Sequence, residues 1–153
     1  MAEQYGIYQA ITEDHERLRR LLDQVTQPNG KDLTDVFVNL QEDLTLHVRA
    51  EEECLYRPLL RSDTTHAAVL HAFEEHHVVD VLLGELAAGE PGNECWNAKA
   101  EVLKDFVQHH LETEEHQLFD GARSAMDQDW ATHQAQLYLS EKERLRTQQY
   151  AHV

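Results

Sequence analysis

The chain has 153 residues, about the size of one compact domain, and 41% of them are hydrophobic. Six glycines and three prolines exclude a collagen-like or Pro/Gly-rich disordered chain, and turn signals are too sparse for a β-sandwich or barrel. Thirteen Lys and Arg against 29 Asp and Glu give a net charge of −16, which repels phosphate backbones and anionic lipids. We therefore expect one mainly helical domain that binds neither nucleic acid nor membranes.

Apolar residues recur at three- and four-residue steps in five stretches separated by short polar breaks. The predicted helices span residues 3–26, 32–61, 65–89, 93–121 or 93–126, and 127–149. A break is expected at Pro28-Asn29-Gly30, and Pro58 should kink or end the second helix. Short connections favour antiparallel neighbours, so the predicted fold is all-α: an up-down-up-down four-helix bundle over residues 1–126, with residues 127–153 as an additional C-terminal helix of the same domain.

No segment suggests export or membrane insertion. The first ten residues have neither the basic start nor the apolar core of a signal peptide, and no apolar run approaches the ~20 residues that span a bilayer. Cys54 and Cys95 have no CxxC spacing, which argues against a disulfide framework and a thiolate zinc site. We expect a cytoplasmic protein in which Cys54 is a small core residue.

The eleven histidines include two in a repeated sequence word. Residues 47–56 and residues 110–119 both read His-xxx-Glu-Glu-xx-Leu-aromatic, which composition alone would rarely produce twice. Upstream, Glu13-Asp14-His15 aligns with Glu74-Glu75-His76, and the His-to-His spacing within each pair of words is nearly equal. The chain therefore contains two helical hairpins of one design.

Four histidines are predicted to face the bundle core. His15, His47, His76 and His110 have mostly apolar neighbours three, four and seven residues away, and each lies near the midpoint of its helix. One helical turn after the second and fourth of them come Glu51 and Glu114, on the same inward faces. Six ionisable groups at one level of a core are costly unless they bind a metal.

The donor set favours a dinuclear centre. Imidazoles and carboxylates without thiolate suit iron, manganese or zinc, and six ligands are too many for one tetrahedral zinc. Within helical bundles such chemistry is most often di-iron, so two iron ions are preferred over manganese or zinc. A ferritin-like site is disfavoured because only one Glu-x-x-His word, Glu74 to His77, occurs, and no HExxH word is present.

Between residues 8 and 120 the sequence resembles the haemerythrin-like, or HHE cation-binding, family. That resemblance implies that one iron is held by His15 and His47 and the other by His76 and His110, with Glu51 and Glu114 bridging them beside an oxo or hydroxo group. Asp80 stands where the oxygen carriers have a fifth histidine, and His-x3-Glu replaces their His-x4-Asp. The set looks more like the branch that includes di-iron proteins of iron–sulphur repair and nitrosative stress.

Other polar residues receive simpler interpretations. Asp80 is expected to be an inward carboxylate, either a metal ligand or a partner of one. Tyr8 and Tyr56 are expected to pack in the core, with a hydrogen bond to a ligand as the alternative. The following residues are expected on the solvated surface: His66, His71, His77, His109, His116, His133, Glu52, Glu53 and Glu115.

Three functions remain open. The first is a non-haem di-iron protein that binds or reduces O2, peroxide or nitric oxide, in oxidative or nitrosative stress or iron homeostasis. The second is an iron or oxygen sensor or buffer without turnover, signalling through the C-terminal helix, which is also a candidate homodimer surface. The third is a purely structural bundle. No acid–base or nucleophile constellation appears, so no catalytic residue is assigned.

Overall fold

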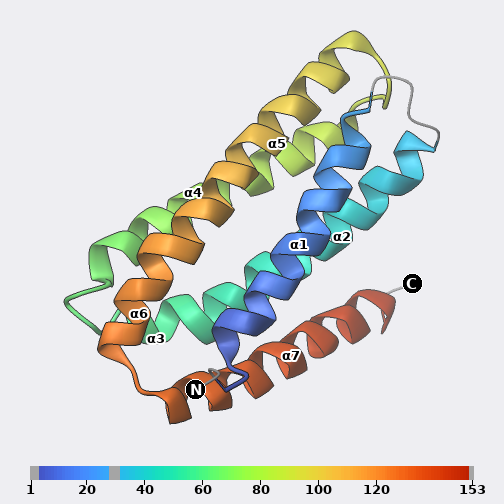
Figure 1. The fold of residues 1–153 in the computed structure, drawn as a ribbon. Helices are drawn as coiled ribbons and strands as arrows, with labels where there is room; N and C mark the ends of the chain where they lie inside the picture. The colour runs from blue at the N-terminus through green and yellow to red at the C-terminus, as the bar shows by residue number, and fades with distance from the viewer. Residues whose placement is uncertain (1–3, 28–31, 152–153) are drawn as a thin grey trace.

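The computed structural model describes residues 4–27 and 32–151, and within them the chain is helical without strands. The helices form long arms that run antiparallel to their neighbours in the chain, and the last helix lies along one side of them (Figure 1). The predicted first residue, Glu3, and the predicted break at Pro28-Asn29-Gly30 lie outside the described residues. The elements are α1 (Ile7–Val25), α2 (Leu33–Glu51), η1 (Glu52–Tyr56), α3 (Arg57–Leu59), α4 (His66–Ala88), α5 (Glu94–Thr113), η2 (Glu114–Leu118), α6 (Phe119–Ala125) and α7 (Gln128–Ala151).

The second and fourth arms each contain one π-helical turn, η1 and η2, where the repeated sequence words lie. A π turn forms i→i+5 hydrogen bonds, so residues five apart lie one turn apart. This geometry places Tyr56 one turn after Glu51, and Phe119 one turn after Glu114. The two π turns therefore bring an aromatic ring of each word onto the side of its inward carboxylate.

Pro58 does not break the second arm, which continues to Leu59. Proline has no N–H to donate to the carbonyl four residues earlier, which is that of Cys54. The amide of Gln134, on α7, donates to this carbonyl instead, at 2.6 Å. A side chain from the fifth helix thus replaces the hydrogen bond that the proline removes.

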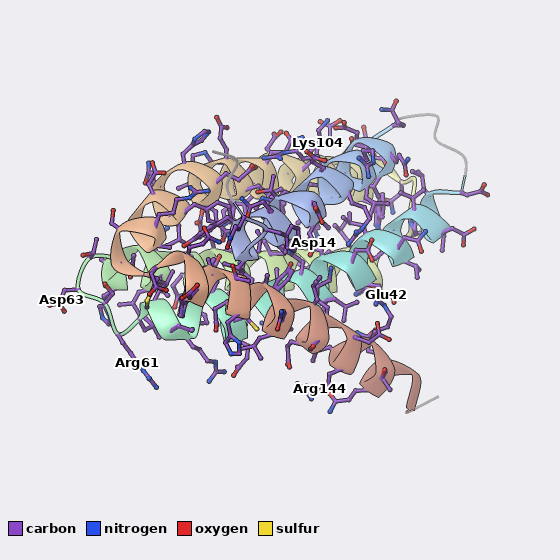
Figure 2. All side chains as sticks on the ribbon, turned by 60° about the horizontal axis from the view of Figure 1, so that its bottom comes forward. Asp14, Glu42, Arg61, Asp63, Lys104 and Arg144 are labelled. Carbon is purple, nitrogen blue, oxygen red and sulfur yellow. The ribbon has the colours of Figure 1, made fainter. Side chains whose placement is uncertain are left out.

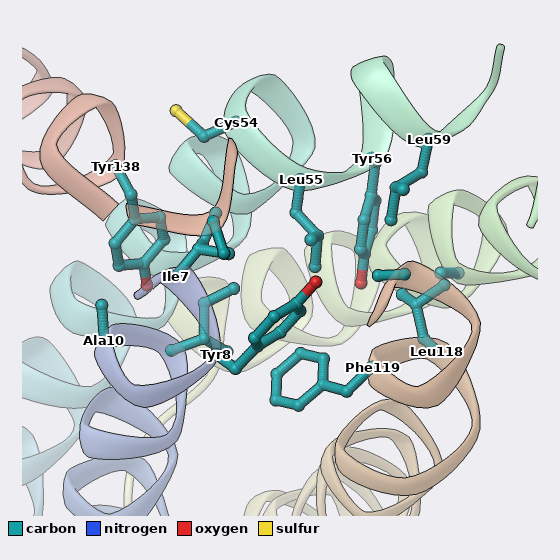
Figure 3. Packing of buried hydrophobic residues seen from close by; sticks show 14 of the residues in the cluster. Ile7, Tyr8, Ala10, Cys54, Leu55, Tyr56, Leu59, Leu118, Phe119 and Tyr138 are labelled. Atoms are coloured by element: carbon teal, nitrogen blue, oxygen red, sulfur yellow. The ribbon is translucent and has the colours of Figure 1, made fainter. Parts of the chain in front are cut away.

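The core consists of two apolar clusters, one on each side of a buried polar layer. One cluster gathers residues near the N-terminal end of α1, including Leu55, Tyr56 and Phe119 (Figure 3). The other contains residues from the opposite ends of the arms, including Leu22 and Trp96. Charged side chains such as Arg61 and Arg144 project outward, whereas Asp14 lies within the bundle (Figure 2).

Helix α7 packs along α1 and α2 and lies away from α4 and α5 (Figure 1). Its buried residues include Ala131, Ala135 and Tyr138, which are at most 2% exposed. Among the described helices, none is long and apolar enough to cross a membrane. The bundle is therefore covered by a fifth helix on one face only.

Candidate metal centre

The structure brings together all six residues that the sequence predicted to face inward. Their exposed fractions are between 0 and 4%. They form two groups that share the two carboxylates, and in each group the donor atoms lie within 4.8 Å of one another. The first group is His15, His47, Glu51 and Glu114, and the second is Glu51, His76, His110 and Glu114.

In the first group, imidazole nitrogens face carboxylate oxygens across short gaps. His15 Nε2 is 3.2 Å from Glu114 Oε1, and His47 Nε2 is 3.2 Å from Glu51 Oε2. These four buried atoms have no hydrogen-bond partner. Buried polar atoms are normally hydrogen-bonded, so two imidazole nitrogens and two carboxylate oxygens that converge without hydrogen bonds need an explanation.

In the second group, the hydroxyl of Tyr56 joins the donors. His76 Nε2 lies 3.0 Å from Glu51 Oε1 and 3.2 Å from His110 Nε2. The Tyr56 hydroxyl oxygen lies 2.8 Å from Glu51 Oε1 and closer still to Glu114 Oε2, and its single proton can be donated to either carboxylate. The same oxygen is also 3.1 Å from His76 Nε2 and 3.4 Å from His110 Nε2. The tyrosine is thus a polar member of the cluster and not only packing.

The residues fit a pair of metal ions. Glu51 and Glu114 each direct one oxygen to the first group and the other to the second, which is the arrangement of a bridging carboxylate. A metal ion in the first group would satisfy the four unpaired atoms. Imidazole and carboxylate donors without sulfur suit iron, manganese or zinc.

A carboxylate stands behind each imidazole, at the ring nitrogen that faces away from the centre. Three of these contacts are 3.0 to 3.3 Å and one is 3.5 Å. Such carboxylates fix the tautomer and orientation of metal-binding histidines. The pairs are Asp14 with His47, Glu52 with His76, Glu75 with His110, and Glu115 with His15.

Two of these carboxylates correct the sequence interpretation. Glu52 and Glu115 were expected on a solvated acidic face, but their side chains are only 15% and 19% exposed. The reason is that the π turns rotate them toward histidines of the opposite hairpin. Glu53, in contrast, is 54% exposed, as expected.

Asp80 does not reach the cluster. Its side chain is 38% exposed and forms an ion pair with Arg49, whose guanidinium also contacts Glu52 at 2.6 Å. Pairing with a cation at the half-exposed edge of α4 avoids the cost of burying a carboxylate in the core. The expectation of an inward carboxylate at this position is therefore wrong.

In the absence of metal, two of the imidazoles have strongly raised pKa values. Burial favours neutral His47, but Glu51 and Asp14 outweigh it and raise the pKa of His47 to about 9. Burial is likewise outweighed at His110, where hydrogen bonds to Glu51 and Glu75 raise the pKa to about 10. Protonated imidazoles therefore compensate the buried carboxylates when no cation is bound.

A cavity of about 240 Å³ opens between α4 and η2, next to the second group. His110 and Glu114 form part of its wall, so it reaches two of the six donors. The remaining wall is a mixture of small, apolar and polar side chains. These are Ala68, His71, Ala72, Glu75, Thr113, Gln117 and Leu118.

Sequence reasoning missed the supporting residues Asp14, Glu75, Tyr138 and Lys142. A signal existed for the first two, because an acidic residue directly precedes both His15 and His76 in the repeat. The six remaining histidines named above are exposed, as predicted. Cys54 is buried, and burial raises the pKa of its thiol to about 12, in agreement with a core role.

Comparison with known proteins gives one family and two relatives. The model of the haemerythrin HHE cation-binding domain matches residues 6–122. A "DNA nickase" from Nostoc sp. (strain PCC 7120 / SAG 25.82 / UTEX 2576) is 30% identical over 132 residues, which cover 83% of this chain but only 37% of that protein. The crystal structure of a haemerythrin HHE cation-binding domain-containing protein from Mycobacterium kansasii is similar with a TM-score of 0.77 at 18% identity, over 95% of this chain and 90% of the other.

Proposed function

This chain belongs to the haemerythrin HHE cation-binding domain family, and we propose that it is a non-haem di-iron protein that binds or reduces a small oxidant such as O2, peroxide or nitric oxide. The observation that carries this proposal is the convergence of four unpaired buried donor atoms on one side of two shared carboxylates. A purely structural bundle would have to balance these atoms by the charge of protonated imidazoles alone, because none of the four makes a well-formed hydrogen bond.

In this proposal, one ion is held by His15 and His47, and the other by His76 and His110. Glu51 and Glu114 serve both ions. Iron is preferred over zinc because redox-active ions would supply the electrons that reduction of an oxidant needs, and over manganese because such centres in helical bundles are most often di-iron.

The protein's own side chains prepare the centre. The outer carboxylates hold each imidazole with Nε2 directed inward, and the two apolar clusters exclude water on either side. The hydroxyl of Tyr56 lies among the donors of the second group, where it can donate a hydrogen bond to a bound ligand. The cavity beside His110 and Glu114 offers a small molecule a path to this group.

No nucleic-acid partner is proposed, although one similar protein is named a DNA nickase. The net charge of −16 opposes binding to a phosphate backbone. The chain also spans only 37% of that protein's length.

Metal analysis and turnover assays test the proposal. Protein loaded anaerobically with Fe(II) and freed of excess metal should hold about two irons per chain, and its reoxidised form should absorb in the near ultraviolet. Variants at exposed histidines, His116→Ala and His133→Ala, should retain both ions. A content that stays clearly below two irons per chain would refute the dinuclear centre.

A second assay separates catalysis from sensing. The reduced protein is mixed with peroxide or nitric oxide in the presence of a chemical reductant, and consumption of the oxidant is followed over many equivalents. Repeated consumption supports reduction of the oxidant. A single stoichiometric reaction supports the alternative of a sensor or buffer without turnover.

A further inference from the structure

One ligand of the proposed centre is supported from outside the family domain. Tyr138 and Lys142 belong to α7, whereas the family match ends at residue 122. Tyr138 is fully buried, and its oxygen lies 2.7 Å from His47 Nδ1. Lys142 Nζ lies 2.7 and 2.8 Å from the two oxygens of Asp14, which itself contacts His47 Nδ1 at 3.3 Å.

The directions of these hydrogen bonds determine the state of His47. Asp14 is ion-paired with Lys142 and Arg17, so it is a carboxylate that only accepts hydrogen bonds. Tyr138 donates its hydroxyl proton to Asp14. Its oxygen therefore accepts from His47 Nδ1, which must carry a proton, so Nε2, the nitrogen that faces inward, is the one that can bind a metal ion once it is deprotonated.

The other three histidines are supported from within the bundle. Glu115 behind His15 pairs with Arg19, and Glu52 behind His76 pairs with Arg49. Behind His110 lies Glu75, which also contacts His71. All of these partners lie within residues 6–122, and α7 packs against α1 and α2 but lies away from α4 and α5. In the described part of the chain, helix α7 thus supports the half of the centre that contains His47 and does not support the half that contains His76 and His110.

We propose that Tyr138 of α7 is a positioning residue for His47, and that α7 thereby strengthens binding of one ion, the one held by His15 and His47, and not of the other. The inference rests on the proposed dinuclear centre. Loss of a hydrogen bond behind a metal-binding histidine typically weakens metal binding 10–100-fold. Because Asp14 remains near His47 in a Tyr138→Phe variant, we expect about a 10-fold loss, at the lower end of that range.

The test is titration of the full-length, metal-free protein with Co(II), followed by visible absorption. The parent should take up two ions in resolvable steps or with two fitted constants. Tyr138→Phe should weaken one of the two constants about 10-fold and leave the other unchanged. Tyr5→Phe is the matched control, because the Tyr5 side chain is exposed (46% for the residue) and its hydroxyl donates to Glu13, away from the cluster.

Two half-site backgrounds identify the affected ion. The background His76→Ala/His110→Ala keeps the donors of the first group, and His15→Ala/His47→Ala keeps those of the second. Adding Tyr138→Phe should lower the Co(II) affinity only in the first background. Equal loss at both ions, or no loss at either, overturns the role of Tyr138. Uptake of fewer than two ions by the parent overturns the dinuclear centre itself, and with it this inference.

Discussion

Replacing Glu51 with glutamine should weaken the binding of both ions, because this carboxylate is shared. One of its oxygens lies 3.2 Å from His47 Nε2, and the other lies 3.0 Å from His76 Nε2. The Glu51→Gln variant keeps the volume of the side chain and an acceptor for the hydroxyl of Tyr56. It loses the negative charge and one donor oxygen, and because Glu51 also faces His47 in the metal-free chain, the Tm of both proteins is measured without metal as well and subtracted.

The size of the fall in Tm depends on how many ions Glu51 binds. Losing a direct ligand should weaken binding at least 100-fold, since loss of an outer partner alone costs up to about that much. An ion present at 1,000 times its Kd stabilises the fold by about 4.1 kcal/mol, and weakening it 100-fold removes about 2.7 kcal/mol. At about 2–4 °C per kcal/mol, Tm falls by roughly 5–11 °C for one ion and roughly 11–22 °C for two.

The assay compares metal content and Tm of the parent and the variant at one fixed concentration of Fe(II) or Co(II). Glu53→Gln is the matched control, because Glu53 is 54% exposed and paired with Arg57. We expect the control to retain two ions and the parent Tm. A Glu51→Gln protein with the parent Tm and unchanged metal affinity would show that this carboxylate does not bridge, and one whose affinity falls for a single ion would limit it to one half.

Three further outcomes follow from the surroundings of single residues. In the metal-free fold the pKa values of His47 and His110 are raised to about 9 and about 10. Their protonation therefore stabilises the fold fully below about pH 6.5, and this stabilisation is lost as the pH rises through 9–10. The Tm of the metal-free protein in scanning calorimetry should accordingly fall between about pH 7 and pH 10. Alkylation at pH 8 with peptide mapping should label exposed Cys95 and spare Cys54, whose thiol pKa burial raises to about 12; rapid labelling of Cys54 would contradict its placement. Asp80→Asn should leave the metal content unchanged, because Asp80 is 38% exposed and outside the cluster; loss of an ion would restore it as a ligand.

The helical arms and the inward residues could be predicted because they depend on local periodicity. A three- and four-residue repeat of apolar positions determines which face of a helix is buried, and it placed His76 and Glu114 correctly. The same reasoning assigned Asp80 to the core because it lies one turn after His76. In the structure Asp80 instead pairs with Arg49 of another helix, and a sequence pattern within one helix cannot predict a partner on another.

The supporting contacts were harder to predict because they join distant parts of the chain. Glu115 reaches His15 and Glu52 reaches His76 only because the π turns change the helical phase just after Glu51 and Glu114. An assumed regular α-helix places both of these acidic side chains on the outside. The contacts made by α7 depend on which face of the bundle it covers, which the hydrophobic pattern leaves open.

The bond from Gln134 to the carbonyl of Cys54 makes folding of the fifth helix and of the second arm interdependent. Until α7 docks, the carbonyl that Pro58 leaves without a donor has no protein partner, and the apolar surface under Ala131, Ala135 and Tyr138 is uncovered. A chain cut after residue 126 would lack both contributions. We therefore expect α7 to unfold together with the bundle in one cooperative transition, and amide protons of its central turns to exchange with solvent as slowly as those of α2.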